Sequence, residues 1–143
     1  MKNLLPTIFA VVLLVSCQPS SQPISYGHDE CTHCKMSIVE APFAAELVTK
    51  KGKVFKFDAI ECMLAYLKEQ SDKDFAMYLV HDYAAPTEWL DATQCEYLVS
   101  NELPSPMGGY LSAYSMKQDA DRMQAGKGGK TYDWASIVTL FEE

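Results

Sequence analysis

Soft metal ligands gather in a short segment near the start of the chain. Between Cys31 and Met36, four side chains carry a potential ligand atom: Cys31, His33, Cys34 and Met36. Thiolate and thioether sulfurs select Cu(I), whereas Zn(II) usually takes four ligands from cysteine, histidine and carboxylate. The methionine therefore favours copper over zinc in this segment.

Cys34 and Met36 form the core of the predicted site. Residues two apart on an extended segment share a face, so the two sulfurs could hold one ion between them. On such a segment His33 would point the other way, which favours an exposed imidazole over a ligand. For Met36 alone, the alternative is a packing role, because methionine commonly fills gaps in cores.

The pair Cys31 and Cys34 is a lone C-x-x-C motif, which redox enzymes, zinc sites and plain disulfides share. In a thioredoxin-like enzyme the motif sits at a helix N-terminus after a strand, where the helix dipole lowers the thiol pKa. Here the motif precedes a predicted strand, and this context argues against an oxidoreductase. A resting disulfide between the two thiols remains an alternative.

Three further residues are considered for a wider site. Cys62 is predicted in the first turn of a helix, where the macrodipole favours a thiolate, so it is a candidate ligand or disulfide partner. Met107 lies between Pro106 and Gly108-Gly109, which exclude a helix interior, and it is a candidate ligand or docking residue. Cys95 gives no specific signal and is predicted to be buried as a small apolar side chain. A zinc site built from all four cysteines after Cys17 is a further alternative.

The start of the chain is typical of an export signal with a lipid attachment site. Lys2 supplies a positive charge, and the apolar run from Leu4 to Val15 is shorter than the roughly 20 residues of a transmembrane helix. The run ends in Leu14-Val15-Ser16-Cys17, which resembles the recognition box of bacterial lipoproteins. Residues 1–16 are therefore predicted to be a signal peptide and Cys17 the lipidated residue. The alternative is an ordinary secretory leader with a chance cysteine.

The mature chain is predicted to be a tethered acidic domain. Residues 17–25 comprise the lipidated cysteine and a flexible Pro- and Ser-rich tether, and residues 26–143 form the folded domain, with possible halves 26–82 and 83–143. Removing residues 1–16 takes Lys2 from the 12 Lys and Arg, so 11 stand against 19 Asp and Glu, a net charge near −8. This charge argues against binding to nucleic acid or to an anionic lipid surface. Apart from the lipidated Cys17 the mature chain has four cysteines, and in an oxidising compartment two disulfides are the default expectation.

A hairpin and a capped helix should position the cysteines. The ranges Phe43–Thr49 and Val54–Phe57 are rich in aromatic and β-branched residues and predict two strands joined by a turn at Gly52. A helix is predicted immediately afterwards, with Asp58 as its N-cap and Glu61 completing a capping box. Other predicted strands are Phe75–His81, Tyr97–Ser100 and Tyr110–Tyr114, and other predicted helices are Asp119–Ala125 and Asp133–Phe141.

The two halves show a faint internal similarity. Phe57-Asp58 and Tyr132-Asp133 are each an aromatic residue and an aspartate that open a predicted amphipathic helix. A methionine lies upstream of each, Met36 or Met107. The spacings from methionine to aspartate, 22 and 26 residues, indicate a degenerate duplication, with coincidence as the alternative.

At these residues the chain resembles the NosL family, the copper-binding accessory lipoproteins of nitrous oxide reductase maturation. In that family the Cys-x-Met pair is the most characteristic element, carried here by Cys34 and Met36. Many members have glycine at the position of Lys35, and Cys31 is not universal. The resemblance also covers the following segments: Phe57-Asp58, Trp89-Leu90-Asp91-Ala92 and Met107-Gly108-Gly109.

The resemblance implies an α+β fold of two related small ββαβ-type units that share a core, similar to part of organomercurial lyases. It also implies a non-enzymatic carrier that delivers Cu(I) to the copper centres of nitrous oxide reductase through an ABC-transporter-linked maturation complex. The expected location is the cell envelope, on a lipid anchor facing the periplasm, in the outer rather than the inner membrane. The competing hypotheses are a thiol enzyme, redox or mercury-lyase-like, with Cys31, Cys34 or Cys62 as nucleophile, and a lipoprotein whose cysteines are purely structural.

Overall fold

The first structural unit is a hairpin followed by a helix and a returning strand. The computed structural model describes residues 18–70 and 72–142. After the short 3-10 turn η1 (Ala41–Phe43), strand β1 pairs with β2 as predicted, and β3 returns on the other side of β1. Strand β4 pairs with β3, so the antiparallel sheet has the order β2-β1-β3-β4. The bounds are Ala45–Thr49 for β1, Val54–Phe57 for β2, Ile60–Glu69 for α1, Phe75–His81 for β3 and Trp89–Asp91 for β4.

The second unit repeats this topology. After the 3-10 turn η2 (Ala92–Gln94), β5 is the central strand between β6 and β7 in an antiparallel sheet of order β6-β5-β7. Both units therefore run ββαβ with the first strand in the middle, and the predicted fold class is confirmed. The short strand β7 was not predicted from the sequence. The bounds are Glu96–Val99 for β5, Leu111–Tyr114 for β6, Lys117–Lys127 for α2, Lys130–Tyr132 for β7 and Trp134–Glu142 for the final helix α3.

The repeat in the structure does not follow the frame that the sequence indicates. Phe57 ends β2 before α1, and the corresponding residue is Tyr114, which ends β6 before α2. Tyr132-Asp133 instead lies between β7 and α3, a helix that follows the complete second ββαβ unit. Met36 precedes β1, whereas Met107 lies in the loop between β5 and β6. The predicted equivalence of the two aromatic-aspartate steps is therefore wrong, and the two methionines are not equivalent either.

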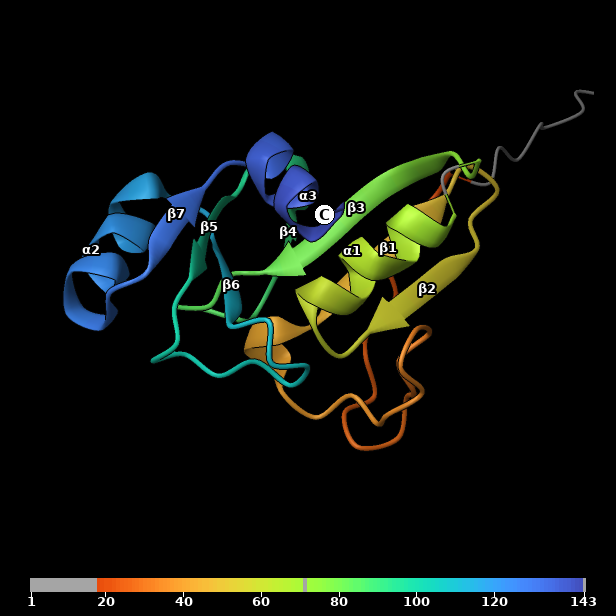
Figure 1. The fold of residues 1–143 in the computed structure, drawn as a ribbon. Coiled ribbons are helices and arrows are strands. Elements are labelled where there is room, and N and C mark those ends of the chain that lie inside the picture. The colour runs from red at the N-terminus through yellow and green to blue at the C-terminus, as the bar shows by residue number, and fades with distance from the viewer. Residues whose placement is uncertain (1–17, 71, 143) are drawn as a thin grey trace, which may run out of the picture.

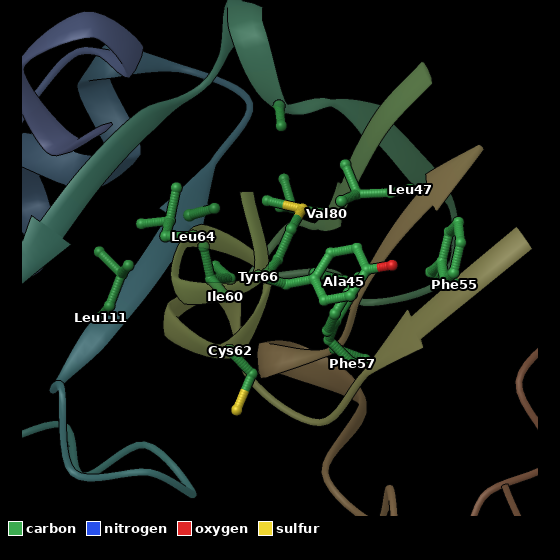
Figure 2. Packing of buried hydrophobic residues seen from close by; sticks show 14 of the residues in the cluster. Ala45, Leu47, Phe55, Phe57, Ile60, Cys62, Leu64, Tyr66, Val80 and Leu111 are labelled. Carbon is green, nitrogen blue, oxygen red and sulfur yellow. The ribbon is translucent and has the colours of Figure 1, made fainter. Parts of the chain in front are cut away.

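The two units share one apolar core. Helices α1 and α3 pack together beside the two sheets (Figure 1). Buried side chains from both units meet in one cluster, part of which is drawn in Figure 2. Met63 is fully buried there, which confirms its prediction as a core residue. The cluster includes Leu47 and Phe57 from the first sheet, Ile60 and Met63 from α1, Tyr97 and Leu111 from the second sheet, and Ile137 from α3.

Helix α1 begins one residue later than predicted. Its N-cap is Ala59, and no side chain makes a capping hydrogen bond. The predicted capping box of Asp58 and Glu61 is therefore wrong. Both carboxylates have other partners, described below, and these tertiary contacts replace the local ones that the sequence pattern favours.

Part of the predicted tether lies against the first sheet. The N–H of Gln22 donates to Glu46 Oε1 at 3.0 Å, and Lys56 Nζ donates to the carbonyl of Pro23 at 2.8 Å. Ile24 packs on the core cluster. We call residues 22–26 the strap. The unattached stretch of the proposed tether is correspondingly shorter than residues 17–25.

The predicted signal peptide and Cys17 lie outside the described residues. Within residues 18–70 and 72–142, no helix combines the length and the apolar character that crossing a membrane requires.

Candidate metal centre

Three thiols and one carboxylate converge at the start of α1. Cys31, Cys34, Asp58 and Cys62 each offer one ligand atom, and these four atoms all lie within 4.8 Å of one another. We call these four residues the thiol cluster. Cys31 is fully buried, Asp58 and Cys62 are nearly so, and Cys34 is half-buried. The structure thus brings together three of the predicted site residues and adds Asp58, which the sequence pattern indicated only as a helix cap.

A tight turn presents the first two thiols. The N–H of Lys35 donates to the Cys31 carbonyl at 3.1 Å, and the N–H of Cys31 donates to the Met36 carbonyl at 2.8 Å. Lys35 has φ 66°, a left-handed conformation that costs a non-glycine residue about 1 kcal/mol. Glycine adopts it freely, which gives a physical reason for glycine at this position in the family that the chain resembles. The predicted extended geometry from Cys34 to Met36 is wrong, because the chain turns at Lys35.

Backbone groups of this turn favour the ionised form of its sulfurs. Hydrogen bonding from the backbone at Asp58 and Cys34 acts to lower the pKa of the Cys31 thiol, and that from the backbone at Met36 acts to lower the pKa of the Cys34 thiol. The Cys34 thiol itself donates to Asp58 Oδ1 at 3.5 Å. Such donors stabilise a thiolate, since hydrogen bonding to the charged form favours it. The turn is therefore preorganised to hold negative sulfur.

Among the three thiols of the cluster, Cys31 has the lowest pKa. The hydrogen bond that the Cys62 thiol donates lowers the pKa of the Cys31 thiol to about 6. The same hydrogen bond strongly raises the pKa of Cys62, because Cys62 must keep its proton to donate it. Burial raises the pKa of Cys34 to about 11. Further ionisation is opposed because the thiolate of Cys31 and the Asp58 carboxylate are already close. A cation among the sulfurs would remove this opposition, so the chemistry suits a thiolate-bound metal ion.

Cys62 also faces an open pocket that contains Met107. The pocket has a volume of about 250 Å³, and its lining includes Cys62, Met107 and His33. Figure 2 shows the Cys62 sulfur pointing away from the apolar cluster. Met107 is 43% exposed and Met36 is 55% exposed, so both predicted methionine ligands are accessible from solvent. His33, predicted to be exposed, is half-buried with Nδ1 3.7 Å from Glu69 Oε2.

Glu61 is a second site residue that sequence reasoning missed. It is 7% exposed and lines the same pocket. Its Oε1 accepts hydrogen bonds from the hydroxyl of Ser105 and from the N–H of Gly109. Burial raises its pKa. The available signal was its position directly before Cys62, but local spacing made a capping role the simpler interpretation.

Cys95 lies outside the thiol cluster. It is buried as predicted, its thiol donates to the Asp91 carbonyl at 3.3 Å, and burial raises its pKa to about 12. The four-cysteine zinc site is therefore not assembled among the described residues. All four cysteines that the structure describes are free thiols, so the default expectation of two disulfides is wrong.

Comparisons with known proteins point to one family. The chain is 29% identical over 150 residues to the copper-binding lipoprotein NosL of Stutzerimonas stutzeri, an alignment covering 92% of this chain and 78% of the relative. The crystal structure of the copper chaperone NosL from Shewanella denitrificans superimposes with a TM-score of 0.71 at 27% identity, covering 82% of this chain and 95% of that chain. The NosL family model matches residues 24–140, most of the chain, and the chain therefore belongs to the NosL family.

Proposed function

We propose that this protein is a metallochaperone that binds Cu(I) and passes it to the machinery assembling the copper centres of nitrous oxide reductase. The observation that carries the proposal is the convergence of three sulfurs and one carboxylate within 4.8 Å. Soft sulfur donors suit Cu(I), and they also suit Zn(II), so the identity of the metal rests on a second observation. The names of both relatives, a copper-binding lipoprotein and a copper chaperone, support the same cargo.

The proposed ligands differ in accessibility, and this difference suits a carrier. Cys31 and Cys62 form the buried side of the site, and Cys34 lies half-buried between them and the surface. In this proposal the thioethers of Met36 and Met107 receive the ion first and release it last because they are exposed, and as neutral ligands they hold Cu(I) less tightly than thiolates do. An ion held by buried thiolates alone would leave slowly.

Burial also favours a carrier over a thiol enzyme. The thiol with the lowered pKa, Cys31, is fully buried, whereas a catalytic cysteine must be accessible to its substrate. The proposed partners are thus the copper ion itself and an ABC-transporter-linked maturation complex that receives it.

Met36→Ala should separate copper transfer from copper binding. The reduced variant should keep Cu(I) affinity within about tenfold of the parent, because the thiols remain, yet transfer copper more slowly to the purified maturation complex. Affinity is measured by competition with a Cu(I) chelator, and transfer is measured by stopped-flow mixing. Met116→Ala is the matched control, since Met116 is similarly exposed at 57% but is the N-cap residue of α2 in the second unit. Transfer at the parental rate by Met36→Ala would contradict the proposed role, and a preference for Zn(II) over Cu(I) in the parent would contradict the proposed cargo.

We further propose that residues 1–16 are removed and that acylated Cys17 anchors the domain in the cell envelope, facing the periplasm. Expressed in a bacterial host, the parent should sediment with membranes, and Cys17→Ser should block processing of the leader. Mass spectrometry of the mature N-terminus checks the acyl chains, of which two or more give stable anchoring. Ser21→Ala, a change beyond the recognition box, is the control and should be processed normally. A soluble product cleaved at another residue would exclude the anchor.

A further inference from the structure

The loop between β5 and β6 is attached to α1 through one buried carboxylate. Glu61 Oε1 accepts a hydrogen bond from the Ser105 hydroxyl and one from the Gly109 N–H, the latter at 3.0 Å. The Ser105 Oγ in turn accepts a hydrogen bond from the N–H of Tyr110 at 2.8 Å. Ser105 and Gly109, which lie on either side of Met107 in the sequence, are therefore both held by the side chain of Glu61. Glu61 is on α1, the helix that carries Cys62.

Gly109 fits this attachment because it has no side chain. A Cβ at Gly109 would lie 2.8 Å from Glu61 Oε1 and 2.9 Å from its Cδ, closer than real Cβ contacts allow. At Gly108, by contrast, a Cβ would meet nothing within 4 Å, and the residue instead has φ +72°, which favours glycine. Gly108 therefore permits the turn, and Gly109 permits the close approach of the Glu61 carboxylate.

The burial of Glu61 is not explained by folding alone. Its Oε2 is buried and has no hydrogen-bond partner among the described residues. Leaving a buried polar atom unpaired costs about 1–3 kcal/mol, and more for a charged group. Glu61 lines the pocket with Cys62 and Met107, so the cost is incurred where the proposed copper ligands meet. Costs of this kind concentrate at functional sites.

We propose that Glu61 is a positioning residue that holds the Met107 loop beside Cys62, so that the Met107 thioether can reach copper bound in the thiol cluster. The inference rests on the proposed function, in which Met107 is a copper ligand. Glu61 acts through its hydrogen bonds to Ser105 and Gly109 and not as a ligand itself. Glutamine at position 61 keeps the acceptor oxygen, so Glu61→Gln should hold the loop as the parent does.

The attachment can be measured without copper. In the copper-free protein, Glu61→Ala should raise the amide hydrogen exchange rate of Gly109 by about tenfold or more, since that N–H loses its acceptor. Glu61→Gln should leave the rate close to the parental value, and amides of β1 should be unaffected in both variants. An unchanged rate at Gly109 in Glu61→Ala would overturn the proposal.

The consequence for copper is tested by a double-mutant cycle in Cu(I) affinity. Glu61→Ala and Gly109→Ala should each weaken binding by about tenfold, the usual cost of losing an outer support of a metal site. In a Met107→Ala background, Glu61→Ala should have no further effect, because there is no thioether left to position. Thermal unfolding of each copper-free variant restricts the comparison to folded protein.

Each result has a definite meaning. Additive effects of Glu61→Ala and Met107→Ala would overturn the proposal, because Glu61 would then not act through Met107. A loss in Glu61→Gln as large as in Glu61→Ala would also overturn it, in favour of Oε2 as a ligand. If Met107→Ala binds copper normally, the role of Met107 in the proposed function fails, while Gly109 exchange still reports whether Glu61 holds the loop.

Discussion

Replacing Cys31 with serine should lower the Cu(I) affinity of the reduced protein by more than about a hundredfold, beyond the 10–100-fold that an outer-shell partner typically contributes. The reason is the position of the Cys31 sulfur in the thiol cluster. Hydrogen bonding from the Cys62 thiol lowers the pKa of Cys31, whereas the pKa values of Cys34 and Cys62 are raised, so Cys31 is the first of the three thiols to ionise. A hydroxyl in its place is a hard, neutral donor that Cu(I) does not favour. Affinity is measured by chelator competition under anaerobic, reducing conditions.

The variant Cys95→Ser is the matched control for this prediction. It makes the same chemical change at a buried cysteine outside the thiol cluster, so copper affinity per folded molecule should not change. The sequence alone favoured Cys34 and Met36 as the core of the site, a core that does not include Cys31. If Cys31→Ser binds copper as tightly as the parent while Cys34→Ser does not, that narrower site is correct and the central role of Cys31 is refuted.

The free energy of unfolding of Glu46→Gln, minus that of the parent, should increase by about 3 kcal/mol as the pH rises from 5 to 8. Glu46 is fully buried on β1 beneath the strap, and burial raises its pKa to about 7. Its Oε1 accepts the Gln22 N–H, and its Oε2 has no partner among the described residues. Between the ordinary pKa near 4.5 and the raised value, the folded state binds more protons than the unfolded state. The contribution of Glu46 to stability is therefore present at pH 5 and is lost as the pH rises through 7.

The measurement is urea unfolding of both proteins across this pH range. Glutamine keeps the acceptor for Gln22 and removes the titration, so the difference between the two stability profiles isolates Glu46 from every other ionisable group. Glu40→Gln, which removes one carboxylate from an exposed position, is the matched control. Parallel profiles for Glu46→Gln and the parent would show that Glu46 ionises normally in the folded protein.

Local patterns in the sequence were sufficient for most of the secondary structure and for the first members of the candidate site. The hairpin of β1 and β2, the strand β3 and the helix α1 follow from the spacing of apolar residues and from turn residues between near neighbours. The C-x-x-C-x-Met segment identifies Cys31 and Cys34 by residue type alone. Cys62 was recognised because its place in the first turn of α1 depends only on adjacent residues.

The predicted capping box and the predicted equivalence of the two aromatic-aspartate steps are wrong for the same reason. In both cases long-range contacts override local preference. Asp58 and Glu61 have the spacing of a capping box, yet one carboxylate faces Cys34 and the other binds the loop that contains Met107. The aromatic-aspartate step at Tyr132 matches the one at Phe57 in sequence but follows β7 and not β6. Neither outcome is visible in a window of ten residues.

The sequence by itself determined the family resemblance, the α+β class and a candidate soft-metal site that includes Cys31 and Cys34. Only the tertiary structure decided that Asp58 and Cys62 join them, that Cys95 does not, and that Glu46 is buried. Strand alternation placed Glu46 on the face of β1 opposite the core, where a glutamate is normally solvated. The strap covers that face from more than 20 residues away along the chain. Residue type and near-neighbour spacing encode what a segment can form, whereas ligand sets and burial depend on which distant segments the fold brings together.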